Sequence, residues 1–375
     1  MKITTTETGR HVGQKLQSLL KTSPDFASGP VVVFWETTKA CALKCLHCRA
    51  TAIPQRNPLE LTTEEGYRLL DDLASAERKP IVIITGGDPF MRQDLFDLLE
   101  YGRDIGLIMS VSPSVTSLIT RDRLKRLFDL GISRLSFSLD GSTAEIHDSF
   151  RGVPGSFDMT MARMQDALDV GLSLQINTVV SRHTLKDLPK IADLLATYPK
   201  MVLWDVFFLV PTGRGQRDDV CSAEEHEEVY RWLMELEKTA PYLIKTTLGQ
   251  HYRRVLLQDS LKDGNDLEKT WAKVSRASAN DGKGVCFVSH VGEVFPSGFL
   301  PVACGNVRKE SVMEIYRSSP IFQELRDPDK LTGKCGQCPF RMVCGGCRAR
   351  AYAFTGDYLA AEPSCSFDPE TFEVD

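Results

Sequence analysis

The chain has 375 residues, of which 42% are hydrophobic and 25% are charged, as is ordinary for a globular protein. Its net charge of −5 argues against a nucleic-acid-binding surface, and its apolar runs are too short to span a membrane. Cysteine is unusually abundant, with eleven residues. Ten of them lie near the two ends of the chain, and the segment from residue 49 to residue 285 contains only Cys221. A secreted disulfide scaffold would be smaller and cysteine-dense throughout. Two clusters of cysteines therefore predict metal ligands or redox groups in a cytoplasmic protein.

From residue 31 to residue 211, short β-branched runs alternate with amphipathic helical stretches. The predicted strands are 31–36, 81–85, 107–111, 134–139, 173–180 and 201–209. The helices predicted between them are 61–76, 93–103, 121–130, 157–170 and 187–196, and Thr62 and Glu65 have capping-box spacing in the first. This alternation predicts an α/β fold with a partial (β/α)6 parallel barrel, in which chemistry collects at the carboxyl ends of the strands.

The remainder of the chain loses this rhythm. A Glu-rich helix is predicted over 223–239, and 240–285 show no strand pattern, so we interpret 221–284 as a helical bridge. From residue 285 onward, short β-like pieces, turns and cysteines predict a small cysteine-rich α+β domain. The predicted organisation is thus an N-terminal extension (1–30), the barrel (31–220), the bridge (221–284) and the cysteine-rich domain (285–375).

Cys41, Cys45 and Cys48 form a C-x3-C-x2-C motif directly after the first predicted strand. Structural zinc usually needs a fourth ligand, whereas three thiolates in one loop suit a [4Fe–4S] cluster with one open iron. The motif in this position resembles the radical S-adenosylmethionine superfamily over about residues 30–215. The resemblance implies that the open iron binds S-adenosylmethionine. One electron then cleaves it to methionine and a 5′-deoxyadenosyl radical, which abstracts a substrate hydrogen.

Other strand ends resemble segments that hold S-adenosylmethionine in this superfamily. Gly86, Gly87 and Asp88 are similar to its Gly-Gly-Glu motif, whose backbone carbonyls bind the amino group, with Asp in place of Glu. Ser138 and Arg151 lie in segments similar to those that reach the carboxylate and ribose. Four further candidates for cofactor binding are His47, Ser114, Asn177 and Pro211. Each of three candidates also has a purely structural alternative. His47 could be an ordinary loop histidine, Arg151 could form a surface ion pair, and Pro211 could belong to a plain turn.

The C-terminal cysteines are Cys286, Cys304, Cys335, Cys338, Cys344, Cys347 and Cys365. Taken alone, their C-x2-C pairs also suit zinc ribbons. After such a barrel they resemble the SPASM extension, which carries auxiliary iron–sulfur clusters, although the last spacing is C-x2-C instead of C-x3-C. The resemblance implies one complete cluster on Cys335, Cys338, Cys344 and Cys365. It leaves Cys286, Cys304 and Cys347 for a second, one thiolate short, because Ser297 stands where related chains often have Cys. We therefore expect one or two auxiliary clusters.

The segments 345–352 and 208–215 are similar to radical enzymes of heme synthesis, which decarboxylate porphyrin propionates to vinyl groups or remove side chains. An auxiliary cluster can accept the electron that decarboxylation releases. The candidate cationic partners of a propionate are Arg214, His251, Arg253, Arg254, Arg348 and Arg350.

The alternative is a maturase that modifies a ribosomal peptide or protein, which a SPASM extension also fits. Only about 30 residues precede the first strand, too few for a leader-binding domain, and this favours the tetrapyrrole. A non-catalytic cluster carrier would leave the S-adenosylmethionine motifs without a purpose. We expect a cytoplasmic enzyme that a flavodoxin or ferredoxin reduces, with no nucleic-acid or membrane partner.

Overall fold

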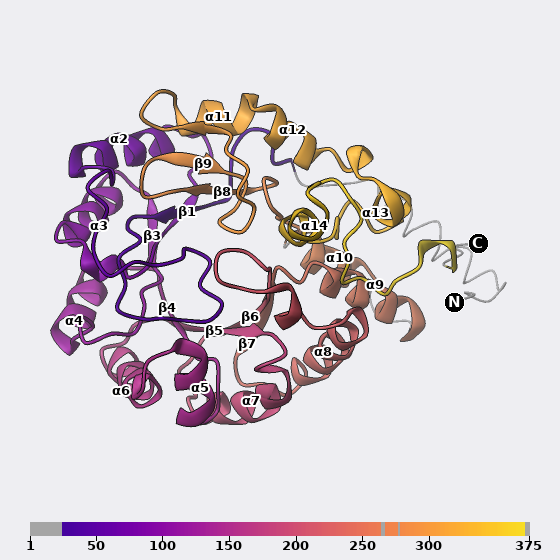
Figure 1. The fold of residues 1–375 in the computed structure, drawn as a ribbon, viewed down its shortest axis with the longest axis horizontal. Helices are drawn as coiled ribbons and strands as arrows, with labels where there is room; N and C mark the ends of the chain where they lie inside the picture. The colour runs from indigo at the N-terminus through magenta and orange to yellow at the C-terminus, as the bar shows by residue number, and fades with distance from the viewer. Residues whose placement is uncertain (1–24, 264–266, 277, 372–375) are drawn as a thin grey trace.

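The computed structural model describes residues 25–263, 267–276 and 278–371, so most of the predicted N-terminal extension lies outside the described residues. In this part of the chain a ten-stranded sheet has the order β10-β9-β8-β1-β2-β3-β4-β5-β6-β7. The strands from β8 through β1 to β7 pair in parallel, and β9 and β10 are antiparallel. The sheet curves around a central space, with helices along its outer side (Figure 1).

The six predicted strands form β1 (Val32–Glu36), β2 (Ile81–Thr85), β3 (Ile108–Val111), β4 (Arg134–Ser138), β5 (Leu174–Val180) and β6 (Leu203–Phe208). The five predicted helices form α2 (Thr63–Ala74), α3 (Leu95–Asp104), α4 (Arg121–Asp129), α6 (Ser156–Asp169) and α7 (Leu188–Ala196). One further helix, α5 (Ala144–Arg151), follows β4 and was not predicted. The predicted α/β fold with a partial parallel barrel is therefore confirmed.

The predicted helical bridge contains a strand. α8 (Ala223–Leu236) forms as expected, and α9 (His251–Asp263) and α10 (Leu267–Arg276) follow. Between α8 and α9, however, β7 (Leu243–Thr247) pairs with β6 at the edge of the sheet. The expectation of no strand in 240–285 was wrong, because an edge strand lacks the apolar pattern of a central one. Leu243 is 66% exposed, and Ile244 is the one buried side chain in β7.

The C-terminal part begins with β8 (Val285–Val288), β9 (Glu293–Phe295) and β10 (Gly305–Asn306). Four helices follow, α11 (Val312–Ser318), α12 (Pro320–Arg326), α13 (Gly333–Gln337) and α14 (Arg348–Thr355). β8 pairs with β1, placing Cys286 opposite Val33, so the sheet continues across residue 285. α14 lies on the open side of the barrel, between the β8 end of the sheet and α9 (Figure 1).

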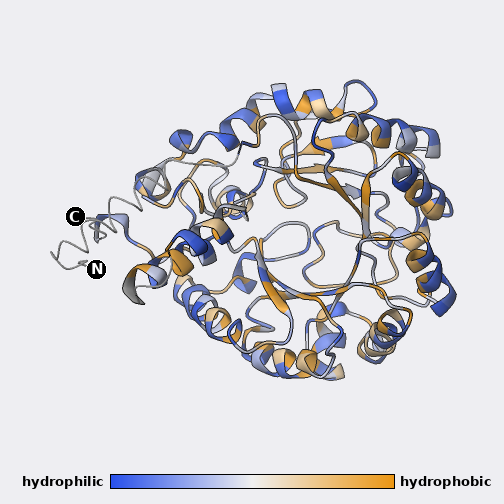
Figure 2. Ribbon diagram, turned by 180° about the vertical axis from the view of Figure 1, so that it is seen from behind, coloured by the Kyte–Doolittle hydropathy of each residue, from blue (hydrophilic) through white to orange (hydrophobic). Residues whose placement is uncertain are grey.

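The main core lies between the sheet and the helices. Trp35, Ile84, Phe137 and Ile176, each on a different strand, are fully buried in it. Figure 2 shows the same division, with hydrophobic strands and with helices whose hydrophilic residues lie mainly on the outside. Among the described residues, no helix is both long enough and apolar enough to cross a membrane. All eleven cysteines are free of disulfide bonds.

Candidate active site

A cavity of about 210 Å³ lies at the carboxyl ends of the barrel strands. Ten of the twelve residues predicted to bind the radical cluster or S-adenosylmethionine line it: Cys41, Cys45, His47, Cys48, Gly86, Gly87, Ser114, Ser138, Arg151 and Asn177. They come from the loop after β1, from the ends of β2 to β4, from β5 and, for Arg151, from the end of α5, and the strand order brings these segments together. Asp88 and Pro211 are the two predicted residues that are not in this lining.

Hydrogen bonds hold the thiol groups of Cys41 and Cys48 in the cysteine loop. Cys41 Sγ lies 3.3 Å from Ser114 Oγ and accepts the Leu43 N–H at 3.3 Å. Cys48 Sγ accepts the Ala52 N–H at 3.4 Å. Burial raises the pKa of the Cys41 thiol, so a bound metal has to displace its proton. The Ser114 hydroxyl also donates to the Gly87 carbonyl at 2.7 Å, which joins the cysteine loop to the glycine motif.

Arg151, the last residue of α5, is buried beside the cysteine loop. Its guanidinium pairs with Asp140 at 2.6 Å and donates to Cys45 Sγ at 3.6 Å. Burial by itself lowers the pKa of Arg151, but Asp140 and the Cys45 sulfur together outweigh burial and raise it, so the guanidinium stays charged. The Nε–H is buried without a partner in the structure. The Nε–H of Arg151 is thus a buried donor that a bound carboxylate could satisfy.

His47 presents an aromatic surface next to the third cysteine. Its ring stacks on Phe150 with centroids 4.3 Å apart and planes 9° from parallel. Burial lowers the pKa of His47 far below its usual range, and the charges of Arg151 and Arg214 lower it further. The ring is therefore neutral at physiological pH.

The glycine motif packs directly against the start of the cysteine loop. A Cβ on Gly86 would lie 2.5 Å from the Thr38 carbonyl oxygen, and one on Gly87 would lie 2.4 Å from that of Ala40. Asp88 turns away from the cavity. Its carboxylate accepts from Phe90 N–H at 3.1 Å and from the Thr116 hydroxyl at 2.8 Å, and burial raises its pKa to about 6. Asp88 therefore shapes the turn after β2.

The donor set of this cavity fits an iron–sulfur cluster. Among the described residues, no three His, Cys, Asp or Glu side chains converge as ligands of a single metal ion do. A cubane needs a different arrangement, in which thiolates from one loop surround a space and one iron faces the cofactor. Cys41, Cys45 and Cys48 line this cavity together with most of the cofactor-binding candidates.

The sequence did not indicate a second polar network beside the cavity. Arg49, which follows the last cysteine of the motif, pairs with Glu36 at the end of β1 at 2.8 Å. Glu36 also contacts His290 at 3.1 Å, and Arg49 stacks over Phe287, with its guanidinium carbon 4.6 Å from the ring centroid. Glu36 and His290 are 254 residues apart, so no local pattern could have predicted this contact.

A second cavity, of about 20 Å³, lies in the C-terminal part. Four cysteines line it, and they are the four that the SPASM resemblance assigns to one cluster: Cys335, Cys338, Cys344 and Cys365. Cys335 Sγ accepts the Glu362 N–H at 3.3 Å and an Arg348 N–H at 3.6 Å. Four thiols around one cavity form a complete ligand set for a cubane cluster.

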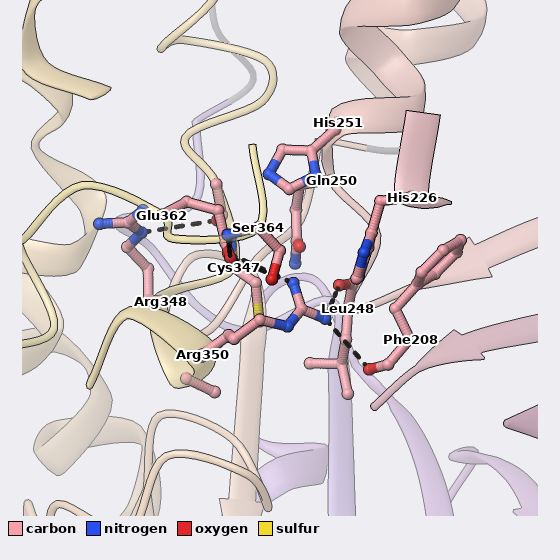
Figure 3. Close-up of polar contacts among 12 residues, drawn as sticks. Phe208, His226, Leu248, Gln250, His251, Cys347, Arg348, Arg350, Glu362 and Ser364 are labelled. Atoms are coloured by element: carbon pink, nitrogen blue, oxygen red, sulfur yellow. Dashed lines mark hydrogen bonds and ion pairs between the residues drawn. The ribbon is translucent and has the colours of Figure 1, made fainter. Parts of the chain in front are cut away.

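The remaining three cysteines are divided between two surroundings. Cys286 is fully buried, and the neighbouring Cys304 contributes to the raised pKa of its thiol. Cys347 precedes α14 and its Sγ accepts the Arg350 N–H at 3.4 Å, while its own N–H donates to Glu362 at 2.8 Å (Figure 3). A cluster on these three thiols stays a prediction.

The six predicted cations for a substrate carboxylate have different surroundings. Arg350 is fully buried and binds Glu362 and the carbonyls of Phe208, Leu209 and Leu248 (Figure 3). Backbone carbonyls or carboxylates also engage three others, Arg253, Arg254 and Arg348, and His251 lines the second cavity. Arg214 differs from these, because its Nε and one terminal nitrogen are buried without partners. Its main-chain N–H donates to the Cys48 carbonyl at 3.0 Å.

Comparison with known proteins shows the family to which the chain belongs. Residues 35–195 match the radical SAM superfamily, and residues 280–339 match the SPASM iron–sulfur cluster-binding domain. The chain is 42% identical to an AdoMet-dependent heme synthase of Methanosarcina barkeri, over 91% of this chain and 98% of the relative. It is 41% identical to one of Nitratidesulfovibrio vulgaris, over 90% and 92%. A mycofactocin maturase of Mycobacterium tuberculosis is 31% identical over 90% and 83%.

Solved structures share the fold at low sequence identity. Streptococcus suis SuiB bound to its precursor peptide superposes with a TM-score of 0.71 at 15% identity, over 91% of this chain and 76% of SuiB. The enzyme anSMEcpe with bound AdoMet gives 0.66 at 17% identity, over 90% and 94%. The sequence comparisons give the assignment, and the solved structures show that the fold is shared. The chain belongs to the radical SAM superfamily, carries its SPASM extension, and is an iron–sulfur enzyme that uses S-adenosylmethionine.

Proposed function

We propose that this enzyme oxidatively decarboxylates propionate side chains of an iron porphyrin to vinyl groups, as a heme synthase. The observation that carries the proposal is the 42% identity along nearly the whole length of a relative of that name. A relative named Fe-coproporphyrin III synthase is 32% identical, and one named pre-heme d1 synthase is 28% identical. Several relatives are thus named for tetrapyrroles.

The reaction divides into a cofactor step and a substrate step. When bound, the cluster and S-adenosylmethionine supply a 5′-deoxyadenosyl radical. In this proposal, the propionate carbon next to the ring would lose a hydrogen atom to that radical. The carboxylate then leaves as CO₂, one electron leaves the substrate, and a vinyl group remains. The electron needs an acceptor, and the cavity of Cys335, Cys338, Cys344 and Cys365 has the thiols to hold one.

The main cavity has two kinds of wall. The polar part of the lining comes from the cysteine loop and the cofactor candidates, and an apolar wall is made by Val179, Phe207, Phe208, Leu209, Val210, Leu248 and Phe299. An apolar wall suits the flat face of a porphyrin, whose propionates need cations. Arg214 is our candidate partner for one propionate, because it lies next to Cys48 with buried donors unpaired.

Anaerobic incubation of the reduced enzyme with S-adenosylmethionine and iron-coproporphyrin III tests the proposal. We expect CO₂, and one 5′-deoxyadenosine for each vinyl group formed. Omission of S-adenosylmethionine is the control and gives neither product. Cofactor cleavage without decarboxylation of any tetrapyrrole would reject the proposal and favour a peptide substrate, which the 31% identity to the mycofactocin maturase supports less strongly.

We further propose that a flavodoxin or ferredoxin supplies the electron that starts each turnover, in the cytoplasm. Eleven free cysteines, of which ten are candidate cluster ligands, support a reducing compartment. The measurement is turnover with purified flavodoxin or ferredoxin and its reductase in place of a chemical reductant. Turnover that only the chemical reductant supports would contradict this part of the proposal.

A further inference from the structure

His251, the first residue of α9, lies at the cavity of the four C-terminal cysteines. It is 1% exposed and shares the lining with Cys335, Cys338, Cys344 and Cys365. Its Nε2 atom is buried and has no hydrogen-bond partner in the structure. A buried polar atom without a partner costs stability unless a ligand satisfies it. An iron–sulfur cluster in this cavity offers sulfur atoms as acceptors.

The neighbouring Tyr230 determines which ring nitrogen carries the proton. Tyr230, on α8, is fully buried, and its hydroxyl lies 3.2 Å from His251 Nδ1. A buried hydroxyl needs an acceptor, and Nδ1 accepts only when it carries no hydrogen. The hydrogen of the neutral ring is then on Nε2, which is the unpaired nitrogen. An imidazolium would also donate from Nε2, so the donor is present in either charge state.

We propose that His251 Nε2–H donates a hydrogen bond to a sulfur atom of the auxiliary cluster held by Cys335, Cys338, Cys344 and Cys365, and thereby raises its reduction potential. Reduction adds negative charge to the cluster, so a donor favours the reduced state. Tyr230 is a positioning residue that fixes the imidazole tautomer. The proposal rests on the SPASM cluster and not on the porphyrin, so it can fail independently of the proposed function.

The surroundings agree with an electron-accepting cluster. Three cationic side chains, Arg254, Lys334 and Arg341, line the same cavity and also favour a more negative cluster. Arg350 and Glu362 connect this region with the main cavity. Arg350 binds carbonyls of Phe208 and Leu248 in the apolar wall, and the Glu362 N–H donates to Cys335 Sγ. The site that would accept the electron is therefore hydrogen-bonded to the wall of the site that would release it.

The test uses the full chain with Cys41, Cys45 and Cys48 replaced by Ala, which leaves only auxiliary clusters. Potentiometric titration followed by electron paramagnetic resonance gives the midpoint potential. We expect His251→Phe to make reduction about tenfold less favourable, a negative shift of ~59 mV for one electron. His251→Gln retains a hydrogen-bond donor, so its midpoint potential should stay close to that of the protein with His251. His226→Gln is the matched control, because His226 lies in the same core without lining this cavity, and it leaves the potential unchanged.

A second measurement needs no variant that alters the cavity. With ¹⁵N-labelled histidine, electron–nuclear double resonance of the reduced auxiliary cluster should show a coupled histidine nitrogen. Tyr230→Phe should change this coupling, because it removes the hydroxyl that fixes the tautomer. The absence of any histidine coupling would overturn the proposal, as would an unchanged potential in an iron-loaded His251→Phe variant. If that variant loses its cluster, the ¹⁵N spectrum decides.

Discussion

At the scale of single residues, we predict that the three cysteines after β1 hold the radical cluster. We expect Cys41→Ala, Cys45→Ala and Cys48→Ala each to abolish formation of 5′-deoxyadenosine, because each removes one of three thiolates. Chromatography after anaerobic reduction with S-adenosylmethionine measures the product. Cys221→Ala is the matched control, since Cys221 is buried in the main core, and it retains cleavage. Wild-type cleavage by the three variants would contradict the assignment of the radical cluster.

Arg214 allows a test of carboxylate recognition. Arg214→Leu should raise the KM for iron-coproporphyrin III by about tenfold, the effect of losing one charge-assisted hydrogen bond. Arg214→Lys retains the positive charge but not the two-pronged guanidinium, so its KM should lie between those of the wild type and Arg214→Leu. The exposed Arg103 serves as control, and Arg103→Leu leaves KM unchanged. An unchanged KM in Arg214→Leu would remove this residue from the substrate site.

The sequence predicted which residues share one cavity where a motif lies in one stretch of chain. From the C-x3-C-x2-C motif, the ends of β2 to β4, β5 and α5, it identified ten residues of that cavity, whose roles stay predictions. It could not predict that Arg151 pairs with Asp140 or that Asp88 faces Thr116. Those contacts depend on which way a side chain turns at a strand end, and packing of neighbouring loops determines that direction.

At the scale of elements, the start of α2 combines a predicted and an unpredicted contact. Thr62 and Glu65 form the predicted capping box, with bonds of 3.2 Å and 2.9 Å. The Glu65 carboxylate also binds Arg308, at 2.8 Å and 3.0 Å. Hydrogen bonding by Arg308 lowers the pKa of Glu65 to about 2. One glutamate therefore caps a barrel helix and joins it to the C-terminal part.

This pair predicts a pH dependence of stability. The folded pKa of Glu65 is about 2 and the ordinary value is 4.5, so the stabilisation is complete above pH 4.5 and is lost toward pH 2. Glu65→Gln retains the capping box but not the charge. It should lower the free energy of unfolding at pH 7 by about 1 kcal/mol, since solvent screens this partly exposed pair.

The measurement is denaturant unfolding of both proteins at several pH values, and the difference between them should shrink below pH 4.5. Glu235→Gln, in an exposed ion pair with Lys238, is the control and has little effect. A difference between wild type and Glu65→Gln that stays constant down to pH 2 would contradict this assignment.

Elements were predictable where burial imposes a pattern. The six central strands are apolar because helices cover their outer face, and all six were predicted. β7 was missed because it is an edge strand with one buried side chain. The pairing of β8 with β1 was also unpredictable, since nothing local to Val285–Val288 specifies a partner so distant in the chain.

At the scale of the whole molecule, a buried ion pair joins the barrel to the C-terminal part. Arg350 and Glu362 are both fully buried, 3.3 Å apart. Burial alone raises the pKa of Glu362, but the Arg350 charge, together with smaller contributions such as the hydrogen bond from Ser364 N–H, outweighs burial and lowers the pKa, so the carboxylate is ionised. Arg350 also donates to Leu248 at 2.9 Å, at the end of the sheet far from β8.

Removal of one partner should be costly. We expect Arg350→Met to lower the free energy of unfolding by about 3–5 kcal/mol, because Glu362 stays buried without its partner. The double variant Arg350→Met/Glu362→Gln should lose less than the single variants together. Anaerobic denaturant unfolding measures this. Lys125→Met, in an exposed pair, is the control and costs at most about 1 kcal/mol. Additive losses would show that the two side chains do not interact.

The pairing of β8 with β1 has a consequence for biosynthesis. β1 is made early, but its neighbour on one side, beginning at Val285, follows roughly 250 residues later. Until then the strand that leads into the radical-cluster loop has an open edge, which is a site for pairing with other chains. In a nascent chain that stalls on the ribosome before residue 285, one edge of the first strand therefore stays unpaired. Chaperones or early cluster insertion would have their greatest effect on yield in that interval.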